Sequence, residues 1–262
     1  MEIFSKNPPK WKKEDILEEL EKFKIIYAQR PIKDNIHGMR FQHMFATYFI
    51  LKKINPSFVI ESGVFRGQST WLIENTLPNS KILSIDVDLT QRVYISKKAE
   101  YSNIDFKDHD FSNLPEDTLV FFDDHVNHYE RLKQAKFFNI KKIILEDNYT
   151  DEKKGDFYTI NHAIKKSGFN HNCKKLSLLK TLLIFLNEFI KKLFLRKYFF
   201  KLDKINSRIR DCSPNINDFK NIEKNLKSYY EFPNLNSIAK LELNLSKLEL
   251  ESYNHITYIE LH

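Results

Sequence analysis

One segment organises the rest of this chain: Phe58-Val59-Ile60-Glu61-Ser62-Gly63-Val64-Phe65-Arg66-Gly67-Gln68-Ser69-Thr70. A short apolar run ends on an acid, a turn with two glycines follows, and Trp71 continues into a helical pattern. The chain has only five glycines, so two in one turn indicate that the backbone passes close to another group there. A strand, a glycine turn and a helix N-terminus together predict a site for a nucleotide-like ligand.

The spacing of Gly63 and Gly67 is Gly-x-x-x-Gly. The dinucleotide fingerprint is Gly-x-Gly-x-x-Gly, so the spacing disfavours NAD. Asp86 ends the next apolar run, Lys81–Asp86, about twenty residues further on, where nucleotide-binding α/β folds hold ribose hydroxyls. Two alternatives stay open from these residues alone, namely a tight turn without a ligand and a solvated turn aspartate.

Apolar runs alternate with helical patterns after residue 57. The predicted strands are residues 58–60, 81–86, 104–106, 118–122 and 142–146. Because these runs are apolar on both faces and are separated by helices, they predict a parallel sheet in an α/β fold. Alternation of apolar and polar side chains at 238–248 and 256–261 predicts a closing antiparallel hairpin.

The predicted elements divide the chain into three parts. Two amphipathic helices, Lys13–Tyr27 and Phe41–Ile54, form an N-terminal helical cap at residues 1–56. Residues 57–171 and 234–262 form the α/β core, and 172–233 form a helical insertion. The polar loop between the two helices carries Asp34, Asn35 and His37, which either face the pocket or belong to a surface connector.

Charge and cysteine content exclude several classes of protein. The net charge is +7, but the lysines are scattered and no arginine-rich block or zinc-finger spacing occurs, so we expect no nucleic-acid partner. Cys173 and Cys212 are too few for a disulfide framework. The first residues lack the apolar core of a signal peptide, and no apolar stretch approaches the roughly 18 residues of a membrane span. We therefore expect a cytoplasmic protein.

Polar residues follow two neighbouring predicted strands. Asp124 comes after 118–122, and Asp147 with Asn148 comes after 142–146. Carboxyl ends of neighbouring parallel strands meet at one edge of the sheet, and these three oxygen donors suit an octahedral Mg²⁺ that keeps positions for water or substrate. The alternatives are a helix N-cap at Asp124 and an ordinary turn at the other two residues.

The pattern Glu-x-Gly-x-Phe-x-Gly-x-Ser in the opening segment resembles the first motif of class I S-adenosylmethionine-dependent methyltransferases. It is most similar in form to the metal-dependent, catechol-type O-methyltransferases. The resemblance covers about residues 30–158. It implies a Rossmann-like sheet and S-adenosylmethionine as the cofactor. The cofactor-binding residues that it implies are Glu61, Gly63, Gly67, Ser69, Asp86 and, near the adenine, Asp110.

The resemblance also implies positions for the metal ligands. Matched residue by residue, Asp124, Asp147 and Asn148 fall on the metal-ligand positions of the catechol-type enzymes, and His125 falls on the adjoining histidine.

The residue at the position of the general base differs from that of the catechol-type enzymes. Asn127 replaces the lysine that serves as the base in those enzymes. The nearest titratable replacements are His125 and then His128, because the unperturbed pKa of histidine suits a base at neutral pH. Glu146 is another candidate.

The function implied is methyl transfer to a hydroxyl of a small molecule or saccharide, assisted by Mg²⁺. Similarity to sugar- and antibiotic-tailoring relatives favours a saccharide hydroxyl, with an aromatic hydroxyl second. Two alternatives are a nucleotide-dependent oxidoreductase on a similar sheet, and a non-catalytic module that binds a membrane or a partner.

Residues 174–203 are the basis of the last alternative. They combine a broad apolar face with interleaved lysines. That composition fits a helix packed on its own core, a homodimer contact, or peripheral contact with the anionic inner face of a membrane.

Overall fold

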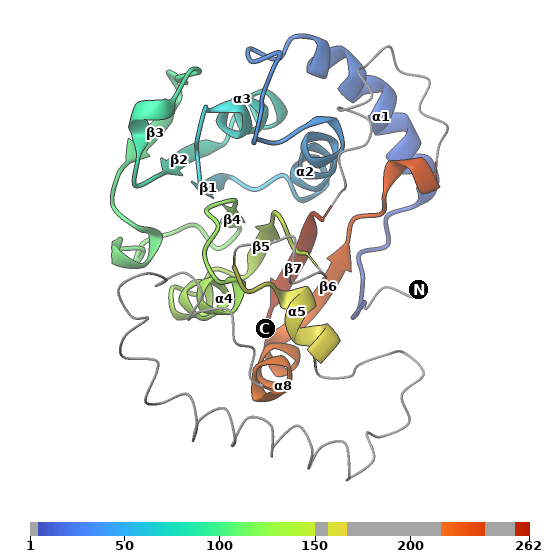
Figure 1. Cartoon of the computed structure of the whole chain (residues 1–262), viewed down its shortest axis with the longest axis vertical. Helices are drawn as coiled ribbons and strands as arrows, with labels where there is room; N and C mark the ends of the chain where they lie inside the picture. The colour runs from blue at the N-terminus through green and yellow to red at the C-terminus, as the bar shows by residue number, and fades with distance from the viewer. Residues whose placement is uncertain (1–4, 150–156, 167–215, 239–254) are drawn as a thin grey trace, which may run out of the picture.

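The structure is a computed structural model that describes residues 5–149, 157–166, 216–238 and 255–262. At its centre the described strands form a seven-stranded sheet in the order β3-β2-β1-β4-β5-β7-β6 (Figure 1). The strands are β1 (Phe58–Ser62), β2 (Lys81–Ile85), β3 (Ala99–Ser102), β4 (Leu119–Phe122), β5 (Lys142–Leu145), β6 (Leu226–Glu231) and β7 (Thr257–Leu261). β1 to β5 are parallel, and β7 is antiparallel to β5 and β6. The predicted Rossmann-like, mostly parallel α/β fold with an antiparallel C-terminal pair is confirmed.

Two strands differ from the sequence prediction. β3 precedes the predicted 104–106 by a few residues. The second antiparallel partner of β7, beside β5, is β6, which lies within the range 172–233 predicted as an insertion. The strand predicted at 238–248 lies, apart from Ile238, outside the described residues. A shift of register between Leu226 and Ser228 breaks the alternation of β6, and this irregularity concealed the strand.

Helices cover both faces of the sheet (Figure 1). On one face lie α1 (Lys13–Ala28), α2 (Phe41–Ile54) and α3 (Gln68–Thr76), and on the other α4 (His128–Phe137), α5 (Ile160–Lys166) and α8 (Ile216–Asn225). Successive residues of a strand point to opposite faces. β4 accordingly gives Leu119 and Phe121 to one hydrophobic core, and Val120 and Phe122 to the other.

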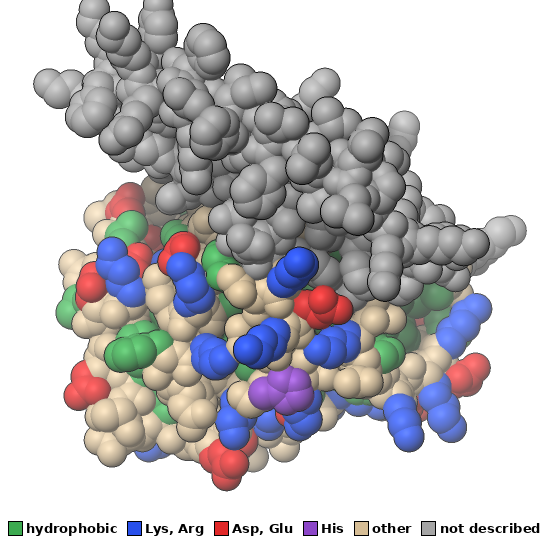
Figure 2. All heavy atoms as spheres, turned by 90° about the horizontal axis from the view of Figure 1, so that it is seen from below, with side chains coloured by type: hydrophobic (Ala, Val, Ile, Leu, Met, Phe, Trp, Pro, Cys, Tyr) green, Lys and Arg blue, Asp and Glu red, His purple; other side chains and the backbone are tan. Residues whose placement is uncertain are grey.

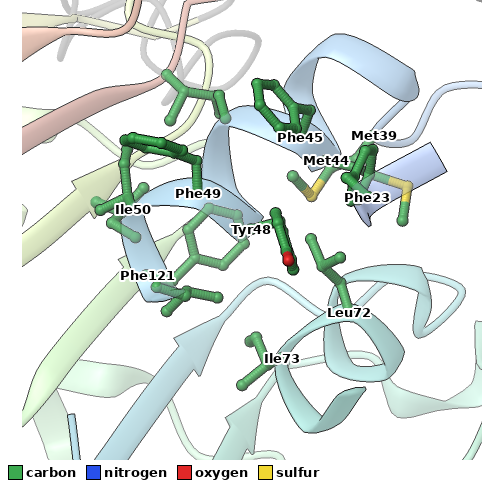
Figure 3. Close-up of a cluster of buried hydrophobic side chains, with 14 of the residues drawn as sticks. Phe23, Met39, Met44, Phe45, Tyr48, Phe49, Ile50, Leu72, Ile73 and Phe121 are labelled. Carbon is green, nitrogen blue, oxygen red and sulfur yellow. The ribbon is translucent and has the colours of Figure 1, made fainter. Parts of the chain in front are cut away.

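The helix α2 is the centre of the first core (Figure 3). Every residue from Phe41 to Leu51 is buried. Phe45 and Tyr48 pack on Phe23 of α1, with ring centroids 5.4 and 5.1 Å apart. A helix that is apolar on all sides has to be enclosed, so α2 is held in a fixed position between α1, α3 and the sheet.

Lysine and arginine side chains are spread over the described surface seen in Figure 2, and acidic and hydrophobic side chains occur among them. None of the helices in the described ranges has both the length and the apolar character needed to cross a membrane. Residues 174–203 lie outside the described part of the chain, so their predicted contact with a membrane or a second subunit stays a prediction.

The carboxyl group of Glu61 joins three elements behind the glycine turn. It is fully buried in β1, and it accepts hydrogen bonds from Thr70 of α3 at 2.6 Å and from Ser84 of β2 at 2.5 Å. Burial raises the pKa of Glu61, because the charged form loses its hydration there.

We predict that Glu61→Gln makes the free energy of unfolding less dependent on pH. A carboxyl group whose pKa is raised by folding loses stabilising effect as pH rises from its unfolded pKa, about 4.3, towards its folded pKa. The slope that it adds is at most about 1.4 kcal/mol per pH unit. Urea unfolding from about pH 5 to pH 8 measures it. The exposed Glu116→Gln is the control, and equal slopes in all three proteins would contradict the prediction.

Candidate functional site

A cavity of about 980 Å³ opens at the carboxyl ends of the parallel strands. It is lined by residues that follow β1, β2, β4 and β5, and by the loop 37–40 with His43 of α2. In an open α/β sheet the ligand site lies where the order of the strands reverses, and here that place is between β1 and β4.

The glycine turn forms one wall of the cavity. Gly63 and Gly67 have φ values of +100° and +87°, which side chains disfavour. A Cβ on Gly63 would lie 2.0 Å from the carbonyl oxygen of Asp123, and one on Gly67 would lie 2.3 Å from that of Tyr94. Gly63 lines the cavity, whereas Gly67 lies behind it against the loop that precedes β3.

Asp86 is placed as predicted, at the end of β2 and in the cavity wall. One carboxylate oxygen accepts hydrogen bonds from the backbone N–H groups of Val64 and Phe65, at 2.8 and 2.9 Å. The other accepts from the N–H of Asp88 at 2.9 Å. Asp86 therefore fixes the turn to β2 and presents negative charge beside it.

Besides Gly67, three predicted cofactor residues lie outside the cavity lining. Glu61 is buried behind the turn, and Ser69 is buried beside it in α3. Asp110 lies on an exposed loop and accepts a hydrogen bond from the N–H of Ser112 at 3.0 Å. The acid that lines the cavity after β3 is Asp105.

The loop before α2 reaches the cavity. His37 lines it, in the left-handed conformation with φ +64°. Asn35 braces the loop by donating to the carbonyl of Met39 at 3.1 Å, and the carbonyl of Asp34 accepts from Arg66 at 2.7 Å. Of these three loop residues, His37 faces the cavity and Asn35 holds the loop together.

Asp124 is held in a buried ion pair with Arg131 of α4. The guanidinium Nη2 lies 2.8 Å from Asp124 Oδ2, and its Nη1 lies 3.0 Å from Asp105 Oδ1. Ser62 also donates to Asp124. Burial alone would lower the pKa of Arg131, but the two carboxylates outweigh it and raise the pKa, so the guanidinium stays charged.

A second group of carboxyls is packed together at the ends of β4 and β5. Glu146 hydrogen-bonds to both Asp123 and Asp147. Burial, and after it the neighbouring negative charges, raise the pKa of Asp123 and of Glu146 well above the usual range. Carboxylates in such a place need protons or a cation to offset their repulsion.

His43 reaches this carboxyl group from α2. Its Nδ1 lies 2.6 Å from Glu146 Oε1. Ligand atoms of His43, Glu146 and Asp147 all lie within 4.8 Å of one another. Burial lowers the pKa of His43, which favours the neutral imidazole that metals bind.

Asn148 has a different environment. Its side-chain N–H₂ donates to Tyr229 of β6 and to Thr257 of β7, both at 2.8 Å. Its side-chain oxygen accepts from the N–H of Asn161 in α5 at 3.0 Å. The amide is fully buried and ties the end of β5 to three other elements, away from the cavity lining.

The two predicted catalytic histidines lie in different environments, and only His125 lines the cavity. His125 lines the cavity with φ +55°, and its Nε2 lies 3.7 Å from Asp147 Oδ2. Its ring stacks on Phe157 with centroids 5.5 Å apart. His128 is buried at the start of α4, outside the cavity lining, and burial lowers its pKa to about 3.

Besides Asp105, three residues of the site were not singled out as ligands or partners from the sequence. They are His43, Arg131 and Tyr149, which hydrogen-bonds to Asp147. His43 follows Gln42 in the first turn of an otherwise apolar helix, and two polar residues there were a usable signal. An arginine in a polar helix gave none, because exposed arginines are common.

No family model matches the chain, and no curated protein matches it significantly. Among solved structures the chain is similar to the O-methyltransferase from Bacillus cereus in complex with SAH, with 9% identity and a TM-score of 0.47 over 97% of this chain and 93% of that one. It is similar to the SAH-bound methyltransferase PaMTH1 of Podospora anserina, with 10% identity and a TM-score of 0.46 over 95% and 88%. A third is the N-terminal domain of EvdMO1 in the presence of SAH and D-fucose, with 16% identity and a TM-score of 0.35 over 52% and 67%.

We predict that Arg131→Met costs about 3–5 kcal/mol of unfolding free energy, because it leaves two partly buried carboxylates without their counter-charge. The control is Lys133→Met on the same helix, which removes an exposed pair with Glu130 and costs less than about 0.5 kcal/mol. Denaturant unfolding compares the two variants. Equal losses would contradict a structural role for the buried ion pair.

Proposed function

We propose that the chain is an S-adenosylmethionine-dependent O-methyltransferase that acts with a divalent cation. One observation carries the proposal: a single cavity joins the glycine turn and the acid after β2 to the buried carboxyls after β4 and β5. The first wall suits a nucleoside, and the second suits a cation that holds an acceptor hydroxyl.

The residues around Gly63 bind and orient the cofactor in this proposal. The turn lets a ligand approach the backbone, and Asp86 at its side can accept hydrogen bonds from ribose hydroxyls. Asp105 takes the place predicted for Asp110, because it is the acid after β3 that lines the cavity. S-adenosylmethionine, when bound, supplies a methyl group on its sulfonium.

The proposed cation ligands are His43, Glu146 and Asp147, with Asp123 hydrogen-bonded to Glu146 beside them. This set keeps Asp147 from the sequence-based prediction. His43 and Glu146 take the place of the two other predicted ligands, Asp124 and Asn148. Asp124 forms an ion pair with Arg131, and the side-chain amide of Asn148 is hydrogen-bonded in a buried network. The donors fit a cation because the carboxyls of Glu146 and Asp147 are crowded together beside Asp123 and burial raises the pKa of Glu146. The third donor is the imidazole of His43, whose pKa burial lowers. A bound divalent cation lowers the pKa of a hydroxyl that it ligates.

His125 is the proposed proton acceptor. It stands in the cavity lining beside Asp147, and its strained φ is typical of functional positions. The acceptor oxygen loses its proton to the imidazole as the bond to the methyl carbon forms and the carbon–sulfur bond breaks. His128 is unsuited to this role, because its lowered pKa leaves it a weak base outside the cavity lining.

The acceptor is proposed to be a small-molecule or saccharide hydroxyl. The cavity wall carries polar side chains from the loop 37–40 and from the strand ends, which suits a polar acceptor. The predicted insertion, residues 172–233, is expected to shape the acceptor side of the pocket. Most of its sequence falls in the range 167–215, which lies outside the described part of the chain. An oxidoreductase and a non-catalytic module remain the alternatives, and binding and activity measurements with cofactor and cation separate them.

For the cofactor we predict that Asp86→Ala weakens S-adenosylmethionine binding at least about tenfold, or about 1.4 kcal/mol. Asp110→Ala is the matched control and leaves the affinity unchanged, because that carboxylate lies on an exposed loop outside the cavity lining. Calorimetry with S-adenosylmethionine, S-adenosylhomocysteine and NAD(H) measures this. Binding of NAD(H) alone would favour the oxidoreductase.

For the cation we predict that transfer stops in chelator and returns with added divalent cation. Glu146→Gln and Asp147→Asn abolish transfer, yet they change S-adenosylmethionine affinity less than about threefold, because the cofactor lies on the other wall. His125→Ala still binds the cation but is slowed at neutral pH. The readouts are methyl transfer from labelled cofactor and equilibrium dialysis of the cation. Full activity in chelator would overturn the metal-assisted reaction.

A further inference from the structure

The cation site proposed above has a nitrogen donor, and the position of that donor is fixed by the fold. His43 is the third residue of α2, 7% exposed, with Met44 and Phe45 fully buried after it. Because α2 is enclosed on all sides, the imidazole is fixed relative to β5 by packing of the core. It is therefore held at the carboxyl cluster whether or not a ligand binds.

The spacing of the donor atoms suits one octahedral ion. Bonds of about 2.1 Å place adjacent ligands about 3.0 Å apart and opposite ligands about 4.2 Å apart. His43 Nδ1 lies 2.6 Å from Glu146 Oε1, and the ligand atoms of these two residues and Asp147 fall within 4.8 Å of one another. The three donor atoms are therefore grouped about as closely as the ligands of one octahedral ion.

The chemistry of the donors bears on the identity of the ion. Oxygen ligands alone suit Mg²⁺, whereas imidazole adds affinity for later divalent transition ions along the series from Mn²⁺ to Zn²⁺. We propose that His43 is a direct nitrogen ligand, and that it makes this site select a transition dication such as Co²⁺ or Zn²⁺ over Mg²⁺. This inference rests on the proposed function for the existence of the site.

The alternative role of His43 is to hydrogen-bond Glu146 and orient it as a ligand. In that case the loss of His43 lowers the binding affinities of all cations by a similar factor. A direct ligand instead changes the ratio of affinities for Co²⁺ and Mg²⁺. The two roles therefore differ in a quantity that does not depend on turnover.

The experiment measures cation binding to the full chain without acceptor. Calorimetry gives the Co²⁺ and Mg²⁺ affinities of the wild type, His43→Gln and His43→Ala, and thermal unfolding reports whether each variant is folded. We expect His43→Gln to lower the Co²⁺ affinity at least about tenfold more than the Mg²⁺ affinity. Loss of both affinities by the same factor would overturn the proposal.

Pulsed electron paramagnetic resonance of bound Mn²⁺ provides a second readout. We expect coupling to a ¹⁴N nucleus in the wild type, its loss in His43→Gln and His43→Ala, and its retention in His37→Ala and His125→Ala. Coupling that disappears in His125→Ala instead would assign the nitrogen to His125 and overturn the proposal. Mn²⁺ bound without ¹⁴N coupling overturns this inference alone, whereas a wild type that binds no cation overturns the cation site of the proposed function as well.

Discussion

The close contact between the glycine turn and the end of β4 is the constraint on which the site depends. Gly63 lies so near the carbonyl of Asp123 that a side chain there would collide with the backbone. β1 and β4 pair in register, with Ser62 opposite Phe122. The turn and the carboxyl cluster therefore start at the same level of the sheet. A cofactor on the turn and a cation on the carboxyls would be neighbours in one cavity, as transfer of a methyl group to a hydroxyl held by the cation would require.

Two groups of carboxyls at this edge differ in their counter-charge. Arg131 forms ion pairs with both Asp105 and Asp124, so that group has a cation within the protein. Asp123 and Glu146 instead keep raised pKa values among neighbouring acids. Such repulsion costs stability, and it is common where a charged ligand supplies the compensation. The contrast separates a structural ion pair from a candidate functional site.

The sequence located both strand ends, because apolar runs, glycines and acids are local signals. It could not say which group each of the neighbouring side chains contacts. Asp123 and Asp124 are adjacent in the sequence, but the buried Arg131 of α4 forms an ion pair with Asp124. Asn148 follows Asp147, but it is bound by β6, β7 and α5, which come much later in the chain. Contacts between distant segments decide these roles, and no local pattern contains them. The irregular register concealed β6 for a related reason.

The place of β7 in the sheet has a consequence for biosynthesis. β5 pairs with β7 on one side, although β7 is formed by residues 257–261. While the chain is being made, β5 therefore presents an open edge with the apolar Ile143 and Ile144 until these residues leave the ribosome. Open apolar edges recruit other strands, and pairings between distant segments form slowly. Nascent chains and fragments that end before residue 257 are the forms in which we expect chaperones to bind and aggregation to begin.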